Sequence, residues 1–384
     1  MELKDICQYI SEKVATTTLT KENYISTENM LPDKGGIVTA SGVPFGNSTA
    51  FSVGDVLVSN IRPYFKKIWQ ANRNGGCSAD VLCFRANSNV DNSYFYYLLS
   101  QQEFFDYIMS GAKGCKMPRG DKKQIMQWKV ELPPLDEQKH IASVLLSLDE
   151  KIELNRRING NLEQQAQALF KAWFVDFEPF KDGKFVDSEL GMIPEGWKVG
   201  NLSDIANITM GQSPDGKSYN ECGDGMIFYQ GRAEFGYRFP YVRLYTTQPK
   251  KIAEPLSILL SVRAPVGDIN IAYYKCCIGR GLAAIQCTNK CQSFLFYLIQ
   301  SLKPIFNQYN GEGTVFGSIS KEALSNIRIV IPKIEVINRF ESIAKNIDRL
   351  ILQYFLQIKN LESLRDTLLP RLMSGEVNIN TITE

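Results

Sequence analysis

The segment LPPLDEQK, residues 132–139, opens a long run of hydrophobic residues at heptad spacing that continues to about Val175. A second run of the same kind opens at IPKIE, residues 331–335, and continues to about Ser374. Hydrophobic residues that repeat at the a and d positions of a heptad form the seam of a coiled coil. The sequence therefore predicts two long helices, with Asp136 as the N-cap of the first.

The two runs share one heptad register at an offset of 199 residues, so that seam positions 141–173 match seam positions 340–372. At a rise of about 1.5 Å per residue, forty helical residues form a rod of about 60 Å. Matched registers favour antiparallel packing as a coiled coil, in which buried polar residues help to fix the register. Two unrelated amphipathic core helices are the alternative. The polar seam positions are Asn155, Asn159 and Arg365.

Short β-rich runs bounded by Gly, Asn and Ser precede each predicted helix. Single helices are also predicted at residues 93–110 and 293–308. The repeat predicts an internally duplicated α/β protein, with a pseudo-two-fold arrangement around two long antiparallel coiled-coil helices. The predicted segments are an α/β domain at 1–131, a spacer helix at 132–179, a linker at 180–196, a second α/β domain at 197–330, a second spacer helix at 331–376 and a tail at 377–384.

The composition is that of a globular protein with two or three domains. The 384 residues have a net charge of +2, and 44% of them are hydrophobic. The sequence has no apolar run of about 18 residues and no charged-then-apolar leader, so we expect a cytoplasmic protein without a membrane segment. The nine cysteines are scattered without a zinc-binding spacing, which predicts free thiols and no metal site.

Two segments together imitate a nucleotide-binding site. Residues 211–218, GQSPDGKS, satisfy the P-loop pattern, and residues 144–150, VLLSLDE, resemble a Walker B strand. A P-loop needs a helix directly after it to bind phosphate, whereas YNECGDG follows Ser218. Residues 144–150 also fall within the first predicted helix. We therefore assign no catalytic residue, since methyltransferase and nuclease motifs are missing too.

Basic residues form local clusters with aromatic residues between them. Residues 56–79 and 235–253 each contain four basic residues and no acidic one, and Arg62 and Arg263 lie in comparable places after strand-like runs. Lys and Arg neutralise DNA phosphates, while Arg and Gln can also bind base edges. A solvated surface or an acidic protein partner is the alternative. The candidate DNA-binding residues are Arg62, Lys66, Lys67, Arg73, Lys116, Arg119, Lys122, Gln212, Lys217, Gln230, Arg232, Arg238, Arg263 and Arg280.

Several large hydrophobic residues of the first helical run lie off the seam or at its end. They can pack beneath the α/β domains, or they can form a docking surface for other subunits. The candidate partner-interface residues are Leu146, Phe170, Trp173, Phe174 and Phe177.

Four segments give the chain a resemblance, over nearly its whole length, to specificity subunits of type I restriction–modification systems. The resemblance implies that each α/β domain is a target-recognition domain for one half of a split, asymmetric DNA site. It also implies that the two helices set the unread gap between the halves and dock two methylation subunits. The four segments are LPPLDEQ at 132–138, LFKAWFVDF at 169–177, IPEGW at 193–197 and LLPRLMSGE at 368–376.

The resemblance further implies that this chain is not itself an enzyme. The cofactors S-adenosylmethionine, ATP and Mg would be bound by partner subunits, namely the methylation subunits and the restriction subunits of the full complex. Two alternatives stay open, a coiled-coil adaptor that binds only proteins and a P-loop ATPase. No motif gives the target bases or the length of the gap.

Overall fold

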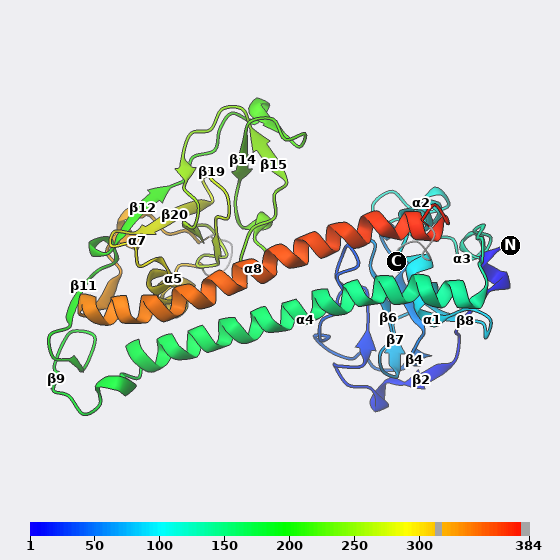
Figure 1. Ribbon diagram of the computed structural model, residues 1–384, viewed down its shortest axis with the longest axis horizontal. Helices are drawn as coiled ribbons and strands as arrows, with labels where there is room; N and C mark the ends of the chain where they lie inside the picture. Colours follow the sequence, from blue (N-terminus) through cyan, green and yellow to red (C-terminus); the bar gives the residue numbers. More distant parts are fainter. Residues whose placement is uncertain (312–316, 378–384) are drawn as a thin grey trace. The chain divides into compact units, whose positions relative to one another are not determined.

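The structure is a computed structural model that describes residues 1–311 and 317–377 (Figure 1). It divides into two compact units: unit 1 comprises Met1–Arg156 and Leu356–Glu384, and unit 2 comprises Arg157–Phe355. Most of the predicted tail lies outside the described residues. Each of the two long helices contributes residues to both units, so that each unit contains one α/β domain and part of both helices.

The two long helices are α4 (Leu135–Phe174) and α8 (Ile334–Met373), each of 40 residues, which confirms the prediction of two long helices. Helix α4 begins one residue before Asp136, so the prediction of Asp136 as N-cap is wrong. Its carboxylate instead lies in the first helical turn, where the positive end of the helix dipole favours it. The second helix begins at Ile334, three residues after its predicted start at 331, because residues 328–331 form a strand.

Unit 1 contains two four-stranded sheets, with strand orders β1-β8-β5-β6 and β2-β4-β7-β3. The strands are β1 (Cys7–Tyr9), β2 (Lys13–Ala15), β3 (Tyr24–Ile25), β4 (Asn47–Phe51), β5 (Val56–Ser59), β6 (Ile68–Gln70), β7 (Gly75–Cys77) and β8 (Val81–Ala86). The helices are α1 (Asn92–Leu99), α2 (Gln102–Ser110) and α3 (Lys122–Ile125), with 3-10 turns η1 (Leu3–Asp5), η2 (Thr16–Thr18) and η3 (Pro63–Phe65).

Strand β5 shows why this sheet is covered on both faces. All four of its residues are buried, and its side chains alternate between two hydrophobic clusters. Val56 and Val58 pack with α1, α2 and the long helices, whereas Leu57 packs against the second sheet. The alternating side chains of this fully buried strand thus contact both the helical layer and the second sheet.

Unit 2 repeats this construction with the sheet β12-β20-β17-β18 and a five-stranded sheet β13-β15-β14-β19-β16. Its main strands are β12 (Ala206–Met210), β13 (Tyr219–Asn220), β14 (Met226–Tyr229), β15 (Leu244–Thr246), β16 (Ile252–Ala253), β17 (Ile258–Ser261), β18 (Ile269–Ile271), β19 (Cys276–Ile278) and β20 (Leu282–Cys287). The short pairs are β9 (Phe185–Val186) with β10 (Ile193–Pro194), and β11 (Lys198–Asn201) with β21 (Arg328–Ile331). The helices are α5 (Gln292–Ser301), α6 (Lys303–Asn307) and α7 (Lys321–Ser325), with turns η4 (Glu178–Phe180), η5 (Leu202–Asp204), η6 (Gly216–Ser218) and η7 (Arg232–Glu234).

Three expectations about local structure change in detail. The helix predicted at 93–110 is two helices, because the chain leaves helical geometry at Gln101. The helix predicted at 293–308 likewise divides into α5 and α6, with Pro304 in the first turn of α6, where its missing N–H is harmless. The predicted linker at 180–196 contains the β9–β10 hairpin, and the ring of Phe180 lies 5.1 Å from that of Trp197.

Within each unit the two long helices pack antiparallel. In unit 1, Asp149 contacts Arg365 and Arg156 contacts Glu362, so rising numbers in α4 meet falling numbers in α8. The seam asparagine Asn155 is fully buried there and donates to Gln357 at 3.3 Å. The predicted polar seam is therefore confirmed at this position, whereas the pseudo-two-fold relation between the halves stays a prediction.

Candidate nucleic-acid interface

Three segments of unit 2, those that follow β12, β14 and β17, converge on a fourth, the turn between β19 and β20 at residues 279–281. Each segment carries one predicted DNA-binding residue at or just beyond its strand end. The backbone bonds that join them are Gln212 N to Ile278 O at 3.0 Å, Gly279 N to Tyr229 O at 2.8 Å and Val262 N to Gly281 O at 3.0 Å. The residues that this arrangement brings to one edge are Gln212, Gln230, Arg263 and Arg280, all of them exposed.

Two glycines make this convergence possible. A Cβ atom on Gly211 would lie 2.1 Å from the carbonyl oxygen of Gly279, and one on Gly279 would lie 2.7 Å from the carbonyl oxygen of Gln230. Both obstructing atoms belong to the backbone, so no side-chain rotation could relieve the overlap. The absence of side chains at these two positions therefore fixes where Gln230 and Arg280 lie.

In unit 1 the segment after β5, residues 60–67, packs against residues 113–122. Arg62 N donates to Pro118 O at 2.8 Å, and Gly120 N donates to Asn60 O at 3.3 Å. The structure thereby combines two basic clusters that are separate in the sequence. Lys113, which is not among the predicted residues, pairs with Arg119 in an antiparallel β-bridge. The predicted residues on these two segments are Arg62, Lys116, Arg119 and Lys122.

The loops after β5 and β17 have the same backbone construction. Ser59 Oγ donates to Ile61 O at 3.0 Å, and Ser261 Oγ donates to Arg263 O at 2.9 Å. Arg263 thus corresponds in backbone position to Ile61. The prediction that Arg62 and Arg263 lie in comparable places is therefore wrong by one residue, and Arg62 is half-buried where Arg263 is exposed.

The partners of these loops are also repeated. Ile61 forms a backbone bridge with Arg119, and Arg263 forms one with Ser318. At the two residues joined by this bridge, unit 1 therefore has its arginine on the partner segment (Arg119), and unit 2 has its arginine on the loop (Arg263). Each unit consequently places an arginine beside the same pair of backbone segments, although neither sequence run alone indicates this.

Backbone strain marks the loop of unit 1. Arg62 and Lys66 flank η3 with φ angles of 50° and 49°, in the left-handed region that side chains other than glycine rarely adopt. Between them the rings of Tyr64 and Phe65 are exposed and lie 4.6 Å apart. Strained residues cluster at binding sites, and exposed rings beside cations suit contact with DNA.

The other predicted residues of unit 1 have partners within the chain. Lys67 Nζ donates to Thr27 O at 2.6 Å, and burial lowers the pKa of its ammonium group. Arg73 lies over the ring of Trp69 at 5.5 Å, in the turn between β6 and β7. Lys67 ends the loop of Arg62, with its ammonium group 6.0 Å from the ring centre of Phe65, whereas Arg73 lies in a different turn. Both stay predictions, with weaker structural support than Arg119.

Two residues of unit 2 also differ from the convergent set. Arg232 forms an ion pair with Asp268, which in addition accepts a hydrogen bond from Lys303 at 2.6 Å. Lys217 is exposed in η6, and its backbone N–H donates to the carboxylate of Asp215 at 2.9 Å. These two cations lie on surfaces from which they could contact phosphate groups.

The prediction that Arg238 contacts DNA is wrong. Its side chain is 3% exposed and forms ion pairs with Glu163 of α4 and Asp348 of α8. Its guanidinium group also lies 4.2 Å from the ring centre of Phe296. A cation whose donors face two carboxylates inside the protein is not available to a phosphate group.

The nucleotide-binding alternative is not supported. Residues 216–218 form a 3-10 turn that leads into β13, so no helix follows the P-loop-like segment to bind phosphate. Asp149 and Glu150 lie within α4, where Asp149 accepts hydrogen bonds from Tyr97 and Arg365. Within residues 1–311 and 317–377 no cluster of three His, Cys, Asp or Glu side chains could hold a metal ion, and no helix there is long and apolar enough to cross a membrane.

The predicted partner-interface residues have different environments. Phe170 is buried in the core of unit 2, so its prediction as a docking residue is wrong. Trp173 and Phe174 are partly buried against the same core, and the ring of Phe177 lies 5.5 Å from that of Trp197. Leu146 is 40% exposed on α4 and stays a candidate.

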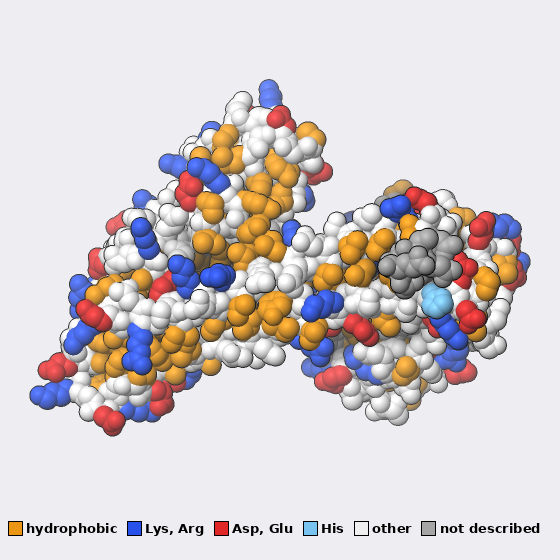
Figure 2. All heavy atoms as spheres, viewed as in Figure 1, with side chains coloured by type: hydrophobic (Ala, Val, Ile, Leu, Met, Phe, Trp, Pro, Cys, Tyr) orange, Lys and Arg blue, Asp and Glu red, His pale blue; other side chains and the backbone are white. Residues whose placement is uncertain are grey.

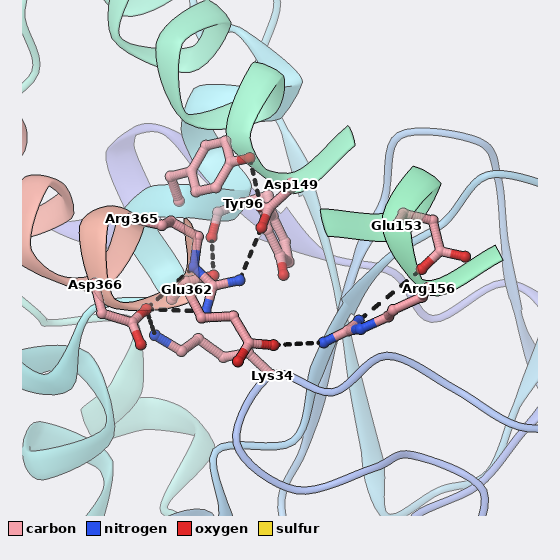
Figure 3. A network of polar contacts seen from close by, with 10 residues as sticks. Lys34, Tyr96, Asp149, Glu153, Arg156, Glu362, Arg365 and Asp366 are labelled. Atoms are coloured by element: carbon pink, nitrogen blue, oxygen red, sulfur yellow. Dashed lines mark hydrogen bonds and ion pairs between the residues drawn. The ribbon is translucent and has the colours of Figure 1, made fainter. Parts of the chain in front are cut away.

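A partly buried polar network in unit 1 was missed by sequence reasoning (Figure 3). Tyr97 donates to Asp149 at 2.7 Å, and Arg365 donates to the other oxygen of the same carboxylate at 2.7 Å. Arg365 also donates to Asp366 at 2.9 Å, and Lys34 of the α/β domain bonds to Asp366 at 3.2 Å. The polar residue at seam position 365 was the only signal of this network in the sequence.

The chain carries charges of both signs in nearly equal numbers, with 43 Lys and Arg against 41 Asp and Glu. On the face shown in Figure 2, Lys and Arg side chains are interspersed with Asp and Glu, while hydrophobic side chains gather over β14 and β15 of unit 2. A net charge of +2 agrees with this mixture. A net charge this small gives no strong field over the whole molecule, so a nucleic-acid interface on this chain would rest on local groups such as the loops described above.

Comparison with known proteins agrees with this duplicated construction. Residues 1–164 and 194–365 match the family described as the type I restriction modification DNA specificity domain. The chain belongs to this family. A putative type I restriction enzyme MjaX specificity subunit of Methanocaldococcus jannaschii is 37% identical over 311 residues, which cover 79% of this chain and 72% of that protein. The HindI specificity subunit of Haemophilus influenzae is 25% identical and is covered over 98% of both chains.

A solved structure shows the same fold. The crystal structure of a type I restriction–modification system S subunit from M. genitalium matches with a TM-score of 0.58 and 17% identity, over 97% of this chain and 95% of that one. The two α/β domains and the long helices are thus the fold of the specificity family. As a member of this family, the chain is a non-catalytic component of a restriction–modification system.

Proposed function

We propose that this chain recognises a bipartite DNA site, with one α/β domain for each half. The observation that carries the proposal is the repeated loop after β5 and β17, in which a serine hydroxyl bonds to the carbonyl two residues further on. In both units this loop lies beside a second backbone segment and carries or contacts an arginine. Two similar sites on one chain suit a DNA target in two parts.

The chemistry of the two loop groups differs, which supports an asymmetric target. The group in unit 2 combines Gln212 and Gln230 with Arg263 and Arg280, and such side chains can bind adenine or guanine edges bidentately. The group in unit 1 contains only cations among its predicted members, beside two exposed aromatic rings. Two domains with different side chains at equivalent loops would recognise different base sequences.

Specificity subunits work together with DNA and other restriction–modification subunits. We propose that two methylation subunits dock on the exposed surfaces of the long helices. Leu135 and Ile334, at equivalent positions in the repeat, are both exposed at the start of their helices, and Leu146 is exposed nearby in α4. The partners would bind S-adenosylmethionine, ATP and Mg, and the assembly would act in the cytoplasm.

Methylome sequencing tests the proposed function directly. Cells that carry this chain with its methylation subunits are compared with cells in which only the gene for this chain is deleted. Loss of one split methylation motif on deletion is the expected result. An unchanged methylome while the methylation subunits are present and active would overturn the proposal.

Arginine substitutions should affect the two half-sites separately. We expect Arg263→Ala to relax recognition of one half-site and Arg62→Ala that of the other, each by about 1–3 kcal/mol if the arginine binds a base edge. Methylation of DNA libraries randomised in each half-site measures this change. Equal weakening on every DNA, with a smaller salt dependence, would instead identify phosphate contacts.

A further inference from the structure

Each unit contains two carboxylates at repeat-equivalent positions of the long helices. Asp149 in unit 1 corresponds to Asp348 in unit 2, and Glu362 corresponds to Glu163. A tyrosine of the α/β domain donates to the aspartate in both cases: Tyr97 to Asp149 and Tyr297 to Asp348, each at 2.7 Å. Burial raises the pKa of both tyrosines.

In unit 1 the helices themselves neutralise the two carboxylates. Arg365 of α8 donates to Asp149 at 2.7 Å, and Arg156 of α4 donates to Glu362 at 2.7 Å. Both arginines lie on the same pair of helices as the acids that they contact. At this level of unit 1, helix arginines therefore balance the charges of Asp149 and Glu362, while Lys34 of the α/β domain pairs with the neighbouring Asp366 (Figure 3).

Unit 2 lacks both of these helix arginines. The positions equivalent to Arg365 and Arg156 are Ala166 and Phe355. Arg238, from the segment between β14 and β15, contacts both acids instead, with one nitrogen on Glu163 and the other on Asp348. A single residue of the α/β domain thus replaces two residues of the helices.

The resulting cluster, called here the arginine clasp, consists of Arg238, Glu163, Asp348 and Tyr297. The side chains of Arg238, Glu163 and Asp348 are 3%, 9% and 19% exposed. Burial alone would lower the pKa of Arg238, but the carboxylates and the Tyr297 hydroxyl together raise it. Gln167 also donates to Glu163 at 3.1 Å. Such a buried ionic group fixes one arrangement of its elements more than it adds stability.

The segment that carries Arg238 also carries candidate DNA-binding residues. Gln230 and Arg232 lie eight and six residues before Arg238 and are exposed. Arg238 O accepts from Ile271 N at 2.9 Å, and the ring of Phe239 lies 4.6 Å from that of Phe355 in α8. The segment is therefore fastened at residues 238 and 239, a few residues after the candidate residues Gln230 and Arg232.

We propose that Arg238 is a positioning residue that holds the segment of Gln230 and Arg232 in place on both long helices, so that recognition of one half-site depends on the arginine clasp. The inference rests on the proposed function. It also predicts an asymmetry between the halves. A replacement α/β domain in unit 2 needs an arginine at this place, whereas one in unit 1 meets helices on which Asp149 and Glu362 already have arginine partners.

The test compares variants of the full chain in complex with its methylation subunits. Arg238→Met should relax recognition of one half-site, the same one that Arg263→Ala affects. The expected change is about tenfold or more, which is the contribution of one well-formed base contact. Recognition of the other half-site should be unchanged. Arg238→Lys keeps the charge but not the two-pronged geometry, so an intermediate loss is expected. Arg328→Met, which removes an exposed pair with Glu189 in the same unit, is the matched control.

A triple variant separates positioning from folding. Arg238→Met combined with Glu163→Gln and Asp348→Asn removes all three buried charges, so thermal stability should return toward that of the wild type. Relaxed recognition of the same half-site in this stable variant supports the proposal. Full specificity in the triple variant would overturn it, because the arginine would then only balance charge. If the wild-type complex recognised no split motif, the proposed function itself would fail.

Discussion

Replacement of Phe340 by alanine should lower the free energy of unfolding of unit 2 by about 3–5 kcal/mol, the cost of a large aromatic removed from a close-packed core. Phe340 is fully buried where α8 meets α4 and α5. Its ring lies among five other aromatic rings. An alanine side chain at position 340 would leave these five rings lining a cavity. These are the rings of Phe170, Trp173, Phe174, Phe294 and Tyr297.

Urea unfolding followed by tryptophan fluorescence measures this effect in unit 2 alone. Unit 2 contains Trp173 and Trp197, so replacement of Trp69 and Trp128 by phenylalanine removes the signal of unit 1. Leu350→Ala, at a site of α8 that is 42% exposed, is the control and should change the free energy by less than about 0.5 kcal/mol. A loss below about 1 kcal/mol for the phenylalanine variant would contradict the central place of this ring.

The helical part of the fold could be predicted from the sequence because its signal is periodic. Hydrophobic residues at the a and d positions repeat every heptad, so this local pattern predicts both helices and the register in which they pack. The structure buries Asn155 fully at its predicted seam position. Even the exception at position 365 has a simple cause, since Arg365 pairs with Asp149 across the seam.

The candidate site could be predicted only in part, because its members meet through contacts distant in the sequence. Nothing local distinguishes Arg238 from Arg243, yet the first is buried and the second is 56% exposed. The difference comes from Glu163 and Asp348, which lie 75 and 110 residues away along the chain. Likewise, the packing of residues 60–67 against 113–122 follows from the tertiary fold and has no periodic signal.

The same distinction explains the error at Phe170. A large aromatic off the predicted seam can face solvent, a partner or its own α/β domain, and the heptad pattern does not choose among these. The structure chooses the third, with the ring of Phe294 from α5 at 5.9 Å. Off-seam residues of a spacer helix therefore need the tertiary fold before they can be assigned to an interface.

Deletion of one heptad from both long helices should change the gap between the two half-sites without changing the half-sites themselves. Removal of residues 153–159 from α4 and 352–358 from α8 keeps the seam in register, because each deletion removes a whole heptad at equivalent positions. Each deletion shortens the helical connection between the units by about 10 Å. At about 3.4 Å per base pair, we expect the methylated motif to shift by about three base pairs.

Methylome sequencing of cells with the shortened chain measures both quantities at once. Deletion of four residues from each helix is the control, because it rotates the seam out of register and should abolish methylation through loss of helix packing. A shortened chain that methylates the original motif with its gap unchanged would show that the helices do not set the spacing. Altered half-site sequences would show instead that the loops depend on the deleted residues, which leave Glu163 and Asp348 in place but include Phe355, the ring partner of Phe239.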